Sequence, residues 1–111
     1  DNNVITQRIQ ESFNKADKAD IQAELKATLK ELAEAVAVMN KELPEEQASE
    51  AADDLEKLVE EATKPKPNKK WYSVSIDGLT QAAENLGKVG EPVISLSKKV
   101  LSLLTGGVLG N

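Results

Sequence analysis

The chain has 111 residues and a formal net charge of −5, and it contains no histidine and no cysteine. This composition excludes disulfides, thiolate chemistry, triads with histidine and His-ligated zinc, and the acidic balance argues against nucleic-acid binding, which needs cationic groups against phosphates. Aromatic residues are 3% of the chain, so a core must be built from Leu, Val, Ile and Ala. We therefore expect one all-α domain over residues 1–111, an antiparallel bundle of four to five helices.

The first predicted helix covers residues 3–15, where Ile5, Ile9 and Phe13 recur every four residues. Residues 2–6 also fit the end of an extended segment. The pattern breaks near residues 15–18. If that break is only a kink, the bundle has four helices instead of five.

Two longer helices are predicted over residues 20–42 and 45–63. The apolar residues in each are spaced alternately by four and three positions, which places them on one helical face. They are Leu25, Leu29, Leu32, Val36, Met39 and Leu43 in the first helix, and Ala48, Ala52, Leu55, Val59 and Ala62 in the second. Asp20 is the expected N-cap of the first. Pro44 ends it and opens the next, so the two helices should be antiparallel neighbours.

Residues 64–71 have the sequence KPKPNKKW and are predicted to form a stiff linker between two halves of the domain. A helix over residues 74–87 should follow, capped by Ser73 or Ser75. Trp71 and Tyr72 stand where the linker meets that helix. We expect Trp71 to pack back on the first turns as a core anchor. The alternative is an exposed Trp71 which, with Lys69 and Lys70, forms an interaction surface.

The last predicted helix covers residues 91–104, and its part from residue 93 to 104 is apolar except for serines and two lysines. We expect it to be the central helix of the bundle, buried on most sides. The alternative is that residues 91–109 form an amphipathic helix that lies on a membrane. The final residues, GGVLGN, should be a frayed tail. No window of 18 uncharged apolar residues occurs, so no transmembrane helix is expected.

Charge is distributed unevenly along the chain. Residues 42–61 contain one basic residue, Lys57, among many acids, and residues 64–70 contain lysines but no acid. The simplest interpretation is a solvated acidic helix followed by a basic linker. A second interpretation is a pair of complementary patches that meet head-to-tail in an assembly. The candidate interaction residues are Trp71, Tyr72, Lys69, Lys70, Asp53, Asp54, Glu60 and Glu61.

Motifs for catalysis or for metal and cofactor binding are weak. Ser95 and Lys98 match S-x-x-K, but the companion motifs are missing. The residues around Gly87 and Lys88 do not match a phosphate-binding loop. The acidic residues do not have the spacing of a calcium loop or of a helical di-iron site. We expect no enzyme activity, no metal and no cofactor.

The stretch NKKWYSVSIDGLTQAAENLGKVGEPVISLSKKVLSLL resembles a helical C-terminal region of cyanobacterial multidomain proteins, of the pentapeptide-repeat, STAND NTPase and TIR-type signalling groups. In that group an Asn/Gly-rich segment precedes the helices, and DNNVITQ is similar to its last residues. The resemblance implies an accessory domain, the C-terminal part of a larger bacterial protein, that mediates association. It supplies no catalytic or binding residues.

The sequence thus predicts a non-enzymatic, cytoplasmic interaction or assembly module. Its partner should be a protein, either a second copy in a homo-oligomer or an adaptor, and not a nucleic acid. The alternative is a membrane-acting bundle that uses residues 91–109.

Overall fold

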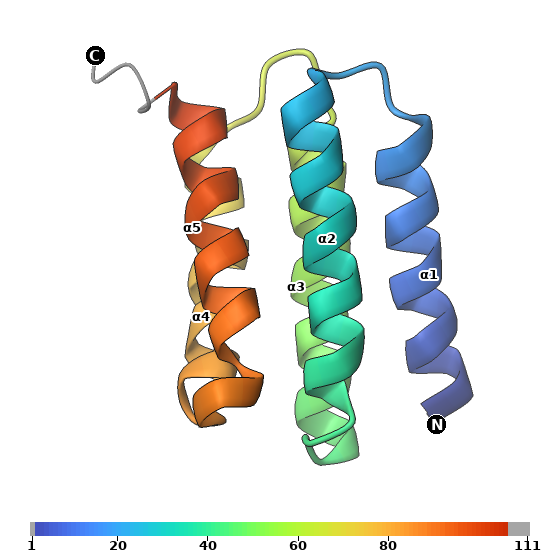
Figure 1. Ribbon diagram of the computed structural model, residues 1–111. Coiled ribbons are helices and arrows are strands. Elements are labelled where there is room, and N and C mark those ends of the chain that lie inside the picture. Colours follow the sequence, from blue (N-terminus) through green and yellow to red (C-terminus); the bar gives the residue numbers. More distant parts are fainter. Residues whose placement is uncertain (1, 107–111) are drawn as a thin grey trace.

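The computed structural model describes residues 2–106 and shows an all-α bundle in which successive helices alternate in direction (Figure 1). The described residues form five α-helices and one short 3₁₀-helix. They are α1 (Asn2–Lys18), α2 (Ala23–Asn40), α3 (Glu45–Ala62), α4 (Lys69–Glu84), η1 (Gly87–Val89) and α5 (Glu91–Thr105). The bundle measures 39 × 27 × 21 Å.

The helices lie in three layers, with α2 and α3 in the middle (Figure 1). Helices α4 and α5 pair with each other and cover one side of this layer, α4 against α3 and α5 against α2. Helix α1 covers the other side and contacts both α2 and α3. Each middle helix therefore packs against three others, which explains why most of the largest fully buried side chains belong to these two helices.

The apolar seams predicted for the two middle helices are confirmed. Leu25, Leu29, Leu32, Val36 and Met39 are buried on α2, and Leu43, beyond the helix, is partly buried. On α3 every predicted seam residue is buried. Three of those are alanines, and such small side chains let neighbouring helices approach closely.

Helix α1 is longer than predicted. It begins at Asn2, so residues 2–6 are helical and not extended, and it continues to Lys18. Its buried face includes Ser12 and Ala16, whereas Phe13 is only partly buried, with the Lys30 ammonium 5.3 Å from its ring centroid. The break over residues 19–22 separates two helices, and the N-cap position of α2 is Gln22 rather than Asp20.

The start of α4 is the largest error in the predicted boundaries. The helix begins at Lys69 and not at residue 74, so the linker is residues 63–68 and not 64–71. Its cap is Asn68, whose side-chain oxygen accepts a hydrogen bond of 2.9 Å from the Lys70 N–H. Because the cap lies before Lys69, Trp71 belongs to the first turn of the helix and not to the linker.

Helix α5 lies at the edge of the bundle, which corrects the prediction of a central helix. It packs on α2, α4 and η1, and its buried residues are Val93, Ser97 and Val100. Leu96 and Leu103 of the predicted seam are only partly buried. The membrane alternative for residues 91–109 and the predicted frayed tail extend into residues 107–111, which lie outside the described part. Of the helices described, none has the length and hydrophobicity needed to cross a membrane.

Candidate interaction site

Trp71 and Tyr72 point in different directions from the first turn of α4. Successive residues of an α-helix are rotated by about 100°, so only one of the two can face the core. Tyr72 is that residue, with 3% of its surface exposed, in line with Ile76, Leu79 and Ala83. Trp71 is 56% exposed. The core anchor is therefore Tyr72, and the prediction that Trp71 fills this role was wrong.

Trp71 lies in an exposed patch that is both apolar and basic. Val74, one turn further along α4, is 60% exposed. The Lys70 ammonium lies 5.4 Å from the Trp71 ring centroid, within the range of a cation–π contact. Lys69 is also exposed. We call Lys69, Lys70, Trp71 and Val74 the Trp71 patch.

A small groove of about 240 Å³ runs beside the Trp71 patch, between α3 and α4. Residues near the end of α3 form one wall of the groove, and residues of α4 that include part of the patch form the other. The lining residues are Lys57, Glu60, Glu61, Trp71, Val74 and Ser75. Trp71 thus borders a concave surface, where a side chain from a partner can contact its ring and Val74 together.

Glu61 has a structural role that the sequence did not indicate. Its side chain is buried, accepts a 2.7 Å hydrogen bond from the Asn68 N–H, and forms a 2.9 Å ion pair with Lys64. The Asn68 N–H and the Lys64 charge hold the pKa of Glu61 below its usual value. This carboxylate fixes the linker on the end of α3, so it supports the position of the Trp71 patch and is not itself free to bind a partner.

Asp53 belongs to an ion-pair network between α1 and α3. Arg8 of α1 donates to Asp53 and to Glu56, each at 3.2 Å, and Lys57 lies 3.0 Å from Asp53. Sequence reasoning missed Arg8, because a lone arginine on an amphipathic helix does not reveal which helix it faces. Exposed pairs of this kind contribute about 0–1 kcal/mol each, so their main effect is to orient α1.

Asp54, the next residue, faces α4. Its carboxylate occupies the space that a Cβ at position 78 would need, so α3 and α4 fit together there because residue 78 is glycine. Burial raises the pKa of Asp54 to about 6, and the neighbouring Asp53 charge adds to the effect. Asp54 therefore belongs to the contact between helices, whereas Glu60 is exposed at the groove.

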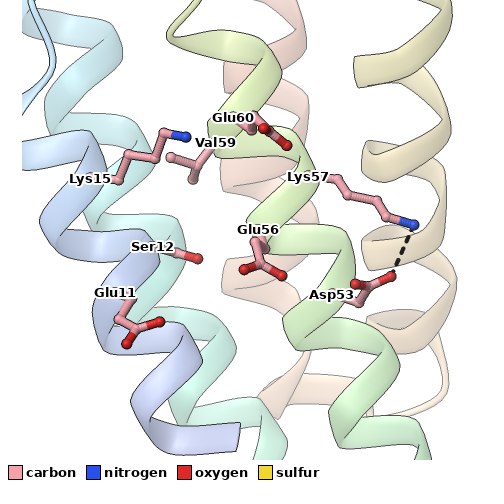
Figure 2. Close-up of a pocket in the computed structure, with 8 residues that line it drawn as sticks. All are labelled: Glu11, Ser12, Lys15, Asp53, Glu56, Lys57, Val59 and Glu60. Carbon is pink, nitrogen blue, oxygen red and sulfur yellow. Dashed lines mark ion pairs between the residues drawn. The ribbon is translucent and has the colours of Figure 1, made fainter.

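A second groove of about 390 Å³ lies between α1 and α3 (Figure 2). The residues drawn in Figure 2 are Glu11, Ser12, Lys15, Asp53, Glu56, Lys57, Val59 and Glu60. The Lys57–Asp53 ion pair lies on its α3 side. Among residues 2–106, no three Asp or Glu side chains lie close enough to hold a metal ion. Two of the acids on these walls, Asp53 and Glu56, are ion-pair partners of Arg8.

The candidate residues therefore separate by role. Trp71 and Glu60 are exposed and line one groove, and Lys69 and Lys70 are exposed in the same turn of α4 as Trp71. Tyr72, Glu61 and Asp54 hold the surrounding helices in place, and Asp53 pairs with Arg8 and Lys57. Ser95 and Lys98 are both exposed on α5, away from these residues in the sequence.

Comparisons of the chain with protein-family models, with curated proteins and with solved structures found no match.

Proposed function

We propose that this chain is a non-enzymatic, cytoplasmic interaction module of a larger bacterial protein, and that it binds a protein partner through the Trp71 patch. The observation that carries the proposal is the position of the single tryptophan, 56% exposed beside an exposed valine. Tryptophan is enriched among residues that dominate the energy of protein interfaces.

Two further features support a protein partner. Aromatic anchors act best in a concave surface from which the bound partner excludes water, and the groove between α3 and α4 supplies the concave surface. The flanking lysines add charge selectivity and faster association. The hydrogen bond that Glu61 accepts and the Asn68 cap hold this turn of α4 in a defined position, which reduces the entropy lost on binding.

A membrane-acting bundle is the second candidate, and the edge position of α5 is the observation that favours it. Leu96 and Leu103 are only partly buried, and Lys98 and Lys99 are exposed on the same helix. Co-sedimentation with vesicles that contain anionic lipid tests this candidate. Retention of the protein in the supernatant would exclude it.

The proposed interface can be tested with two matched valine substitutions. Val74 lies in the Trp71 patch, and Val38, on α2, is exposed to a similar extent, 60% against 57%. We expect Val74→Asp to lower the association, measured by light scattering or by binding to the parent protein, at least tenfold. Val38→Asp should leave it unchanged. Equal effects of the two substitutions, or no effect of either, would contradict the proposal.

A further inference from the structure

The two ends of the bundle carry opposite charge. Because successive helices alternate in direction, the linker 63–68, the first turn of α4 and the end of α1 lie at one end (Figure 1). We call this the basic end. The turn between α2 and α3, the start of α1 and the connection between α4 and α5 lie at the other, which we call the acidic end.

The basic end presents lysines without acidic partners. Lys66, Lys69 and Lys70 are exposed, and no carboxylate of residues 2–106 forms an ion pair with them. Lys64, by contrast, pairs with Glu61. Together with Trp71 and Val74, the unpaired lysines form an apolar surface that is flanked by positive charge.

The acidic end contains a groove with the complementary character. It lies between the start of α1 and the start of α3, has a volume of about 480 Å³, and is lined by Val4, Ile5, Arg8, Glu45, Glu46, Ser49 and Glu50. Val4 is 53% exposed, so this groove offers apolar as well as acidic surface. We call it the acidic-end groove.

We infer that the partner of the Trp71 patch is a second copy of this chain, which presents its acidic-end groove to the patch. Trp71 and Val74 of one copy would cover Val4 of the next, and Lys69 and Lys70 would face Glu46 and Glu50. Burial of apolar surface supplies the attraction, and the opposite charges select the orientation. This inference rests on the proposed function and identifies the partner.

The geometry makes the interface head-to-tail. The two surfaces lie at opposite ends of one molecule, so a copy that uses its Trp71 patch keeps its acidic-end groove free for the next. Such a heterologous contact builds a ring or an open chain, whereas an isologous contact would stop at a dimer. An anionic lipid surface is the less favoured occupant, because Glu60 and the charge of −5 on the whole chain would be repelled by it.

Charge-reversal variants of each end test this inference. The first is Lys69→Glu with Lys70→Glu, which removes the basic surface and places acids where the helix dipole favours them. The second is Glu46→Lys with Glu50→Lys, whose folding can be checked by circular dichroism. The control is Lys88→Glu with Lys98→Glu, which changes the net charge as the first variant does at exposed positions outside both surfaces.

The expected results are specific to a head-to-tail contact. Each end variant alone should be monomeric by light scattering, because it lacks one of the two surfaces. An equimolar mixture should assemble again into alternating copies of the two variants, because the unchanged surfaces complement each other and the two charge-reversed surfaces also carry opposite charges. The Lys88/Lys98 control should assemble like the wild type, and added salt should weaken that assembly.

Three outcomes would overturn the inference. The first is a mixture that stays monomeric. The second is a Glu46/Glu50 variant that assembles like the wild type. The third is a wild-type chain that stays monomeric and binds only vesicles with anionic lipid. If the second outcome occurs while Val74→Asp still abolishes association, the Trp71 patch is an interface and only the identity of its occupant is wrong.

Discussion

The two sides of the first turn of α4 differ sharply although their residues are neighbours in the sequence. On the inner side Tyr72 is buried with Ile76, Leu79 and Ala83. On the outer side Trp71 and Val74 are among the most exposed large apolar residues of the described chain. The larger aromatic ring, that of Trp71, is exposed, and the smaller ring of Tyr72 is buried.

This difference separates residues that stabilise the fold from residues that are available for a partner. Burial of an apolar side chain stabilises a domain in proportion to the area removed from water. Trp71 contributes little in that way in the isolated chain, and under the proposed function its apolar surface is buried by a partner.

Tyr72→Ala should destabilise the bundle by about 3–4 kcal/mol, because it leaves a cavity in the core between α4 and its neighbours. Chemical denaturation monitored by circular dichroism gives the free energy of unfolding. A loss below about 1 kcal/mol would show that Tyr72 is not the anchor of this helix.

Gly90→Ala should destabilise the bundle by about 1–3 kcal/mol. A Cβ at position 90 would meet the backbone carbonyl of Ala83, at the far end of the inner side of α4, so the connection to α5 would have to shift. Gly87→Ala is not a matched control because Gly87 has a positive φ of 59°. Thermal unfolding measures the effect. An unchanged midpoint would show that Gly90 does not approach the Ala83 carbonyl this closely.

Asp54 makes the contact between α3 and α4 sensitive to pH. Its pKa is raised to about 6, so the folded chain binds a proton more tightly than the unfolded chain does. The free energy of unfolding should therefore rise as the pH falls from 7 towards 4.5, by about 1 kcal/mol after allowance for solvent screening.

Asp54→Asn should remove this gain, because the amide carries no charge at either pH. Below pH 4.5 the free energy of unfolding should fall as the pH falls further. The pKa values of Asp17 and Glu61 are lowered in the folded state, so protonation of these groups costs stability. A wild-type profile identical to that of Asp54→Asn between pH 7 and 4.5 would contradict the account of Asp54.

Trp71→Ala should change the free energy of unfolding by less than about 0.5 kcal/mol, the usual range for a surface substitution. The same change should abolish association. The contrast with Tyr72→Ala is the sharpest test of the two sides of α4, because both substitutions remove an aromatic ring within one turn. A loss of 3 kcal/mol or more in the free energy of unfolding would show that Trp71 is a core residue.

Much of the fold followed from apolar spacing. The seams of α2 and α3 were predicted residue by residue, and the start of α5 at Glu91 was predicted too. The start of α4 was missed because Ser73 and Ser75 were preferred as caps over Asn68, which follows Pro67 and carries the same kind of signal. That one choice also placed Trp71 before the helix and led to the wrong anchor.

The remaining features depend on how the helices pack against one another. The spacing of residues within one helix carries no information about that packing. The contact of Asp54 with Gly78 requires the relative register of α3 and α4. The pairing of Arg8 with Asp53 requires the groove that α1 occupies. The edge position of α5 could not be predicted either, because a helix with one partly exposed flank has an apolar pattern like that of a central one.

If the chain associates through the Trp71 patch, the outer side of α4 becomes covered in the assembly. Trp71 is the only tryptophan, so its fluorescence reports on this surface alone. We would record its emission maximum over a dilution series of the wild-type chain, in parallel with light scattering. We expect the emission maximum to shift to shorter wavelength as the mass rises. A rise in mass with unchanged emission would show that the chain associates through another surface, and would contradict association through the Trp71 patch.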